Sequence, residues 1–113
     1  MTSYTETEYS VERRSKPRME CAFPAVVRQS GSGTTRFQEQ ATLLNLSGNG
    51  LYLRMNRRVE VGQALFVVAR FSNVAESDLR TTRIAFRGTV VRSEARSDGM
   101  CGIAIMFNQH RFL

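Results

Sequence analysis

The chain has 113 residues, 42% of them hydrophobic, so it can form one globular domain with a single core and is too short for two. Its formal net charge is +6, and all but one of its 16 basic residues are arginine, which indicates an anionic partner. The sequence has no apolar run of about 18 residues and no basic start followed by an apolar stretch, which excludes an ordinary membrane span or secretory signal and favours a cytoplasmic protein.

The N-terminal part divides into two segments of opposite charge. Residues 1–12 are polar, acidic and without periodicity, which is typical of a flexible tail. A basic segment follows, Arg13-Arg14-Ser15-Lys16-Pro17-Arg18, in which four of the six residues are basic. Because a proline disfavours helix in the residue before it, this segment is predicted to be extended or looped. We place the domain at residues 13–113.

The rest of the chain has the pattern of short strands. The clearest case is the alternation of Leu51, Leu53 and Met55 with Tyr52 and Arg54, a period of two. No segment carries the apolar stripe of an amphipathic helix over three turns. An all-β barrel or sandwich is therefore predicted. The expected strands cover residues 21–28, 37–46, 51–55, 64–71, 81–93 and 101–107.

Several local signals refine this prediction. Pro24 indicates an edge strand or a bulge, and Asp98-Gly99 is typical of a hairpin turn. Met55 and Met106 are expected in the core. The arginines along residues 80–96 are interpreted as mainly solvent-facing, with Arg83 and Arg87 on one face of their strand.

No residue pattern indicates an enzyme or a metal centre. Cys21 and Cys101 each lie in an apolar run, where a free cysteine usually acts as a small buried hydrophobe. His110 is the only histidine, and it has no clustered cysteine or carboxylate beside it, which makes a poor metal site. Without a nucleophile–base pair or a carboxylate pair, the chain is interpreted as a non-enzymatic protein that needs no cofactor.

Two features carry recognisable binding chemistry. The arginines of the basic segment can each bind a phosphate or the O6/N7 edge of guanine with two hydrogen bonds. The turn Asn45-Leu46-Ser47-Gly48-Asn49-Gly50 offers short polar side chains at a strand end, and its glycines allow close approach of a ligand or a positive φ. A cationic arm and a rigid polar turn together suit a small, multiply charged nucleotide.

These two features, in this order, resemble the paired signature of the PilZ domain family. Arg14-x-x-x-Arg18 matches RxxxR, and Asn45-x-Ser47-x-x-Gly50 matches (D/N)xSxxG. The following Leu51-Tyr52-Leu53 and the closing segment 101–107 are also similar to the family. The resemblance covers roughly residues 12–108. It implies a six-stranded antiparallel β-barrel, here with little or no C-terminal helix, because only residues 108–113 follow the last expected strand.

The resemblance also implies a ligand, cyclic di-GMP, a bacterial second messenger with two guanines and two phosphates. Arg14 and Arg18 would clasp phosphate and guanine, Asn45 and Ser47 would contact guanine, and Gly50 would permit the tight turn. In the family, an arginine at the position of Arg13 tends to accompany an intercalated dimer of the ligand. Binding would order the basic segment and so signal to an effector protein.

Two other functions remain open from the sequence. One is a PilZ-like adaptor that binds only protein, although degenerate members usually lack the motifs that this chain keeps. The other is a barrel that binds single-stranded nucleic acid, which the charge allows but the lack of tryptophan disfavours. The chain is expected to be a monomer or a weak homodimer.

Overall fold

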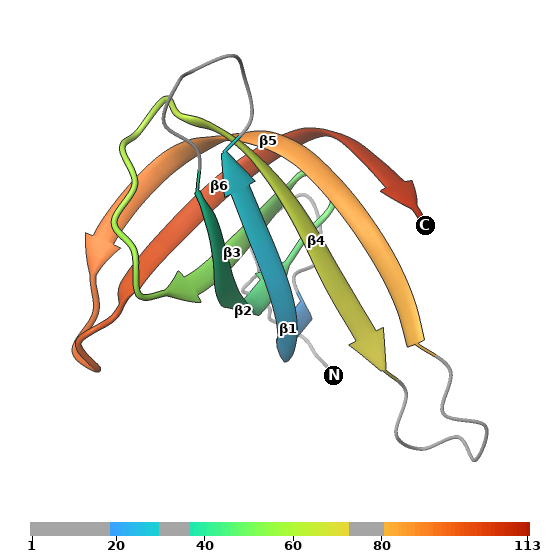
Figure 1. Ribbon diagram of the computed structural model, residues 1–113, viewed down its shortest axis with the longest axis horizontal. Helices are drawn as coiled ribbons and strands as arrows, with labels where there is room; N and C mark the ends of the chain where they lie inside the picture. The colour runs from blue at the N-terminus through green and yellow to red at the C-terminus, as the bar shows by residue number, and fades with distance from the viewer. Residues whose placement is uncertain (1–18, 30–36, 73–80) are drawn as a thin grey trace, which may run out of the picture.

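The computed structural model describes residues 19–29, 37–72 and 81–113, which form six antiparallel strands closed into one barrel (Figure 1). Neighbouring strands follow the order β1-β2-β3-β6-β5-β4. The all-β, six-stranded barrel expected from the sequence is therefore confirmed. The predicted N-terminal tail over residues 1–12 and the basic segment lie outside the described residues. The strands are β1 (Met19–Gln29), β2 (Gln38–Leu46), β3 (Gly50–Met55), β4 (Ala64–Ser72), β5 (Thr81–Ala95) and β6 (Cys101–Phe112).

The core fills the barrel because successive side chains of each strand point to opposite sides. In β3, Leu51, Leu53 and Met55 are buried, whereas Tyr52 and Arg54 face outward and are half-buried. The same alternation holds in β4, where Leu65, Val67 and Ala69 point inward, and in β6, where Ile103, Ile105 and Phe107 do. The period of two in residues 51–55 thus located the inward residues of β3 correctly.

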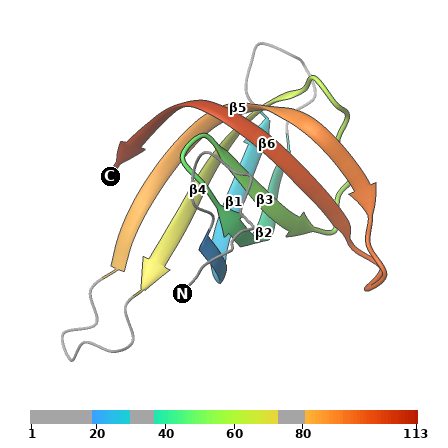
Figure 2. The same ribbon diagram turned by 180° about the vertical axis from the view of Figure 1, so that it is seen from behind.

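The last strand is longer than predicted. β6 continues past Phe107 to Phe112, because β5 runs alongside it and pairs Ile84 with Phe112 and Phe86 with His110. The residues after Phe107 are exposed, which made them look like a tail in the sequence. Figures 1 and 2 show β5 and β6 as two long strands that arch over one side of the barrel. In the part of the chain that the structure describes, no helix follows β6.

Bulges adjust the register at two places that matter for function. In β1 the pairing with β2 shifts between Glu20 and Phe23, so the bulge suggested by Pro24 is present nearby. The edge-strand alternative is excluded, since β1 pairs with both β2 and β4. In β5 the register shifts between Val90 and Arg92. This second bulge determines which β5 side chains reach the outer surface near β3.

Of the two methionines expected in the core, one is buried there and the other is not. Met55 is completely buried, but the side chain of Met106 is 55% exposed. Met106 lies between Ile105 and Phe107, which both point inward, so the alternation of β6 places it on the outside. Cys101 is half-buried and packs against the core, which agrees with its interpretation as a small hydrophobe.

The β5–β6 connection is the tight hairpin that Asp98-Gly99 predicted. Gly99 has a φ of 83°, and its N–H donates to the carbonyl of Arg96. The Met100 N–H donates to the carboxylate of Asp98, which lowers the pKa of that carboxyl. In residues 19–29, 37–72 and 81–113, no helix is long and apolar enough to cross a membrane.

Candidate binding site

The turn between β2 and β3 is held by a ring of hydrogen bonds around Ser47. Its backbone N–H donates to the carbonyl of Gly50 at 2.9 Å, and its Oγ accepts from the N–H of Gly50 at 3.2 Å. The carbonyl of Asn49 in turn accepts from the N–H of Phe107 at 2.9 Å, which ties the turn to β6. Ser47 is therefore a structural part of the turn as well as a candidate contact for a ligand.

The glycines of this turn do not serve as positive-φ residues. Among the described glycines, a positive φ occurs only at Gly62 and Gly99, so that alternative is wrong for Gly48 and Gly50. A Cβ at Gly50 would meet Ile105 O at 3.4 Å and Ser47 Oγ at 3.5 Å, which is ordinary van der Waals contact. The protein itself thus leaves room for a methyl group at Gly50, on the side where a ligand would approach.

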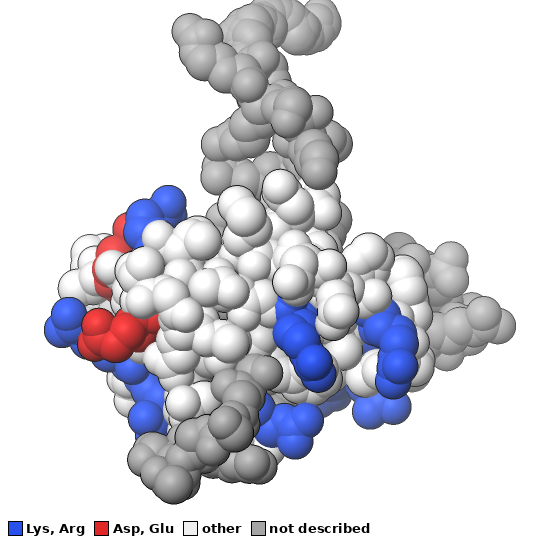
Figure 3. Space-filling view, turned by 90° about the horizontal axis from the view of Figure 1, so that it is seen from above, with Lys and Arg blue, Asp and Glu red and all other residues white. Residues whose placement is uncertain are grey.

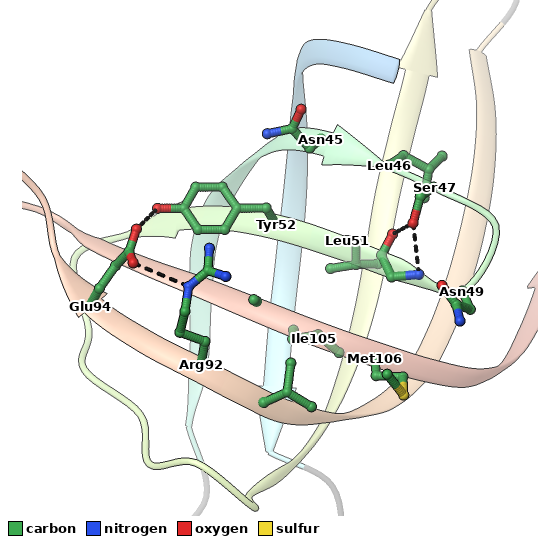
Figure 4. Close-up of a pocket in the computed structure, with 13 residues that line it drawn as sticks. Asn45, Leu46, Ser47, Asn49, Leu51, Tyr52, Arg92, Glu94, Ile105 and Met106 are labelled. Carbon is green, nitrogen blue, oxygen red and sulfur yellow. Dashed lines mark hydrogen bonds and ion pairs between the residues drawn. The ribbon is translucent and has the colours of Figure 1, made fainter. Parts of the chain in front are cut away.

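A pocket of about 450 Å³ opens beside this turn on the outer surface of the barrel (Figure 4). Its centre follows one rung of paired residues across four strands: Asn45 of β2, Tyr52 of β3, Ala104 of β6 and Arg92 of β5. Ala104 is small, so the floor between Tyr52 and Arg92 stays open. Ser47, Asn49 and Gly50 line the pocket at the turn, and Val91, Ile105 and Met106 add apolar surface.

Asn45 brings an unmet hydrogen-bonding requirement to this pocket. Its Oδ1 is buried and has no hydrogen-bond partner among the described residues. A buried acceptor left without a donor costs roughly 1–3 kcal/mol. A ligand that donates an N–H to this oxygen would therefore remove this free-energy cost.

A network of charged and aromatic side chains forms the opposite wall. The Tyr52 hydroxyl donates to Glu94 Oε2 at 2.8 Å and accepts from Arg96 NH1 at 3.3 Å. Arg92 donates from its Nε to Glu94 Oε1 at 3.2 Å and lies over the Tyr52 ring at 5.7 Å. The hydrogen bond from Tyr52, assisted by the nearby arginines, lowers the pKa of the Glu94 carboxyl. Glu94 therefore stays ionised and orients Arg92.

Gly102 makes this wall possible. It lies on β6 opposite both Arg54 and Glu94, and the phenol of Tyr52 passes over it. A Cβ at Gly102 would collide with the Tyr52 hydroxyl. The absence of a side chain here lets Tyr52 reach Glu94 across β6.

The first strand begins next to the same turn. Met19 pairs with Leu46, and Glu20 pairs with Asn45. Arg18 is bonded to Met19, so the basic segment is joined to the barrel directly beside Ser47. Arg14 is five residues from Met19 in the sequence, which puts its Cα at most about 18 Å from that of Met19 in a fully extended chain. Both arginines of the RxxxR pair are thus within chain reach of the pocket.

The structure brings together three of the predicted site residues and adds others. Asn45, Ser47 and Gly50 all line the pocket, whereas Arg13, Arg14 and Arg18 lie outside the described residues. Arg54, which lies on the same face of β3 as Tyr52, contacts Thr42 and Asp98 and does not line the pocket. Arg92 was interpreted as a mainly solvent-facing charge and Glu94 was not singled out; only the strand pairing reveals the place of both in the site.

The pocket combines acceptors, an arginine fork and a phenol in one place. Asn45 can accept from an N–H, Arg92 can donate two hydrogen bonds to a phosphate or a base edge, and Met106 and Val91 offer apolar contact. In the described part of the chain, no group of three or more His, Cys, Asp or Glu residues could hold a metal ion. The arrangement favours recognition of a nucleotide.

Comparison with known proteins places the chain in context. The model of the PilZ domain family, whose members are non-enzymatic receptor and adaptor domains, matches residues 12–111. Among solved structures, the Inhibitor of motility (MotI/DgrA) of Bacillus subtilis superposes with a TM-score of 0.63 at 14% sequence identity. That alignment covers 88% of this chain but 44% of the other, so this chain spans less than half of that structure, and the likeness concerns the fold alone. No curated protein gives a significant sequence match.

Proposed function

This chain belongs to the PilZ domain family, and we propose that it is a receptor that binds cyclic di-GMP at the β2–β3 turn. The basic segment would close over the ligand from one side, and the rung from Asn45 to Arg92 would hold it from the other. The observation that carries this proposal is that Asn45, whose Oδ1 is buried without a hydrogen-bond partner among the described residues, lines a pocket together with Arg92.

The chemistry of the ligand matches the groups that line the pocket. Guanine presents N–H donors on its pairing edge, which suit the Asn45 oxygen, and the O6 and N7 acceptors, which suit an arginine fork. The phosphates suit the planar guanidinium groups of Arg14 and Arg18, which can each donate two hydrogen bonds. An arginine at position 13 supports a stacked pair of ligands in preference to a single one.

Signalling would follow from ordering of the basic segment. A ligand changes the conformation of a protein only by its differential affinity for the two states. Here the differential contacts would be those between the ligand and Arg13, Arg14 and Arg18. The reshaped surface would then be recognised by an effector protein.

A protein-only adaptor is the second candidate, and a nucleic-acid barrel is the third. The third is disfavoured because Tyr52 is the one aromatic residue among the described residues that line the pocket, and Arg92 and Arg96 already lie against its ring. Retention of a pocket with an unpartnered acceptor favours the receptor over the adaptor.

Calorimetric titration with cyclic di-GMP tests the proposal, with GTP and cyclic AMP as controls. We expect saturable binding of cyclic di-GMP alone, with close to two ligands per protomer. Arg14→Ala and Arg18→Ala should each weaken binding by at least about tenfold, since a hydrogen bond to a charged group contributes roughly 1.5–3 kcal/mol. Arg58→Ala, an exposed arginine outside the pocket, is the matched control and should bind like the wild type.

The competing functions give different results in the same experiment. No heat and no thermal shift at high ligand concentration would contradict the receptor and favour the adaptor. Binding that is unchanged in Arg14→Ala and Arg18→Ala would show that the site assignment is wrong. Stronger, salt-dependent binding of a single-stranded oligonucleotide would favour the nucleic-acid barrel.

A further inference from the structure

A second surface lies on the outer side of β1, β4, β5 and β6, away from the pocket of Asn45. It consists of three rungs of outward side chains, which we call the outer basic face. Pairing across the strands fixes its composition. The rungs are Arg28–Phe66–Arg87–Gln109, Val26–Val68–Ala85–Arg111 and Arg70–Arg83 with Leu113 beside them.

The charge of this face is unbalanced. All five of its arginines are exposed, and none has a carboxylate partner among the described residues. At the other end of the barrel, by contrast, Arg54, Arg57, Arg92 and Arg96 each pair with an acidic side chain. Figure 3 shows the acidic side chains gathered toward one end of the molecule, while basic side chains alone mark the other.

The middle rung is apolar over β1, β4 and β5, ends at Arg111 of β6, and lies between two rungs that carry the other four arginines. Val26 and Val68 are half-buried, and Ala85 is only 7% exposed although it is not part of the core cluster. A hollow of about 660 Å³ opens here, with Phe66, Ala85 and Arg111 in its lining. An apolar side chain of a partner could therefore enter between the arginines.

The spacing of the rungs matches the dimensions of a helix. Outward residues of one strand are about 6.7 Å apart, so the two basic rungs are about 13 Å apart on either side of the apolar one. An α-helix with its side chains is about 10–12 Å across. Four strands spaced by about 4.8 Å span about 14 Å, which is the length of about ten helical residues. A helix lying across the strands would cover the middle rung and place both of its flanks over arginines.

We propose that the outer basic face binds an amphipathic helix of a partner protein, with acidic residues on both sides of its apolar stripe. The charge of the face requires the acidic residues, and the middle rung requires the apolar stripe. Arginine and aromatic side chains are the residues that most often dominate protein–protein binding energy. In the receptor proposed above, this surface would be the one that contacts the effector protein. That role rests on the proposed function, but the binding of a helix does not, since it can be measured without the nucleotide.

Nucleic acid fits this face less well. Phe66 is its only aromatic residue, and the guanidinium groups of Arg28 and Arg87 lie 5.1 Å and 5.7 Å from the centre of the ring. The ring is therefore engaged by the protein and cannot act as a stacking platform for bases. An anionic membrane also fits this face less well. Membrane binding needs large apolar side chains that insert among the lipids, and the apolar residues of the middle rung are short valine and alanine side chains.

The test is selection of a displayed library of random helical peptides, 18 or so residues long and so about 27 Å in helical length, against the full chain. We expect the enriched peptides to carry an apolar stripe at i, i+3, i+4 and i+7 flanked by Asp or Glu. One enriched peptide is then synthesised and titrated by fluorescence anisotropy. Arg87→Glu and Arg83→Glu should each weaken its binding by at least about tenfold. Arg58→Glu is the matched control, with the same change of charge outside the face, and should bind within about twofold of the wild type.

Cyclic di-GMP titration of the same variants separates this proposal from the proposed function. Arg87→Glu should keep the nucleotide affinity of the wild type, because Arg87 does not line the pocket of Asn45. Enriched peptides without acidic flanks, no enrichment at all, or equal binding to Arg87→Glu and Arg58→Glu would each overturn the proposal while leaving the receptor intact. Binding of an oligonucleotide or of phosphatidylglycerol vesicles through these arginines, in place of any peptide, would overturn it in favour of that partner.

Discussion

At the scale of single residues, the site depends on groups that the barrel leaves unsatisfied or unfilled. Asn45 has a buried oxygen without a partner in the described chain, and Gly50 leaves space for a methyl group on the pocket side. Neither feature improves the stability of the barrel. Both are understandable if a ligand completes the hydrogen bond and occupies the space.

Asn45→Ala should separate binding from stability. Because the buried Asn45 oxygen accepts no hydrogen bond within the described protein, its removal should leave the free energy of unfolding unchanged or raise it by up to about 1–3 kcal/mol. The affinity for cyclic di-GMP should fall by at least about tenfold. Chemical denaturation and calorimetry measure the two quantities. A variant that loses stability but keeps its affinity would contradict the assignment of Asn45 to the ligand.

Gly50→Ala should also weaken cyclic di-GMP binding without lowering stability, in this case for a steric reason. The added Cβ would make ordinary contacts at 3.4 Å and 3.5 Å, so the free energy of unfolding should change by no more than about 1 kcal/mol. The methyl group would occupy space meant for the ligand, and affinity should fall. Gly99→Ala is the converse control, because its φ of 83° strains an alanine but lies away from the pocket. Gly99→Ala should lower the free energy of unfolding and keep the wild-type affinity for cyclic di-GMP. Full affinity in Gly50→Ala would place the ligand elsewhere.

At the scale of elements, one bulge in β5 determines the second half of the site. The shift between Val90 and Arg92 aligns Arg92 with Ala104 and, across β6, with Tyr52. Val91 is the extra residue and is 49% exposed at the pocket wall. Without the bulge, the outward positions after Val90 would move by one residue and Arg92 would point to the other side of the sheet.

Substitution within β5 tests whether Arg92 contacts the ligand. Arg92→Ala should weaken cyclic di-GMP binding by about tenfold or more, because a charge-assisted hydrogen bond is lost. Arg87→Ala, on the same strand but outside the pocket, should not change the affinity. Glu94→Gln should strengthen binding, since it removes a negative charge beside an anionic ligand and releases Arg92. If all three variants bound cyclic di-GMP with the affinity of the wild type, β5 would be excluded from the site.

At the scale of the whole molecule, the barrel separates two surfaces with different chemistry. The pocket of Asn45 lies on the outer side of β2, β3, β6 and β5, and its charges are paired with one another. The outer basic face lies on β1, β4, β5 and β6, where the arginines have no described carboxylate partners. β5 and β6 take part in both surfaces, at different points along their length.

The pH dependence of the pocket follows from Glu94. Its pKa lies below the ordinary value of 4.5, chiefly because the Tyr52 hydroxyl donates a hydrogen bond to the carboxylate. A carboxyl with a lowered pKa stabilises the folded state above the ordinary value, and this contribution is lost as the pH falls through the lowered pKa. The difference in unfolding free energy between wild type and Glu94→Gln should be constant above pH 4.5 and shrink below it. Denaturation at several pH values measures it, and a change between pH 6 and 8 would have to come from another group.

The sequence alone determined the parts of this protein that depend on local pattern. Short apolar runs separated by turn signals identified the six strands, and alternation identified the inward residues of β3, because a period of two is a property of the strand itself. The turn from Asn45 to Gly50 was predicted to contact a ligand from its residue types and its resemblance to the family motif; its residues line the pocket, and the ligand contact itself remains a prediction. The assignment of Arg13, Arg14 and Arg18 to the ligand remains a prediction.

Only the tertiary structure decided which distant residues share a surface. Arg92 and Glu94 join Asn45 because closure of the barrel brings β5 beside β6 and a bulge corrects their register. The outer basic face likewise needs the pairing of β1, β4, β5 and β6 before its arginines form one patch. The far end of β6 was missed for the same reason, whereas Met106 was misjudged although the alternation along β6 itself places it outside. Pairing between strands far apart in the sequence depends on the packing of the whole core, which no local pattern encodes.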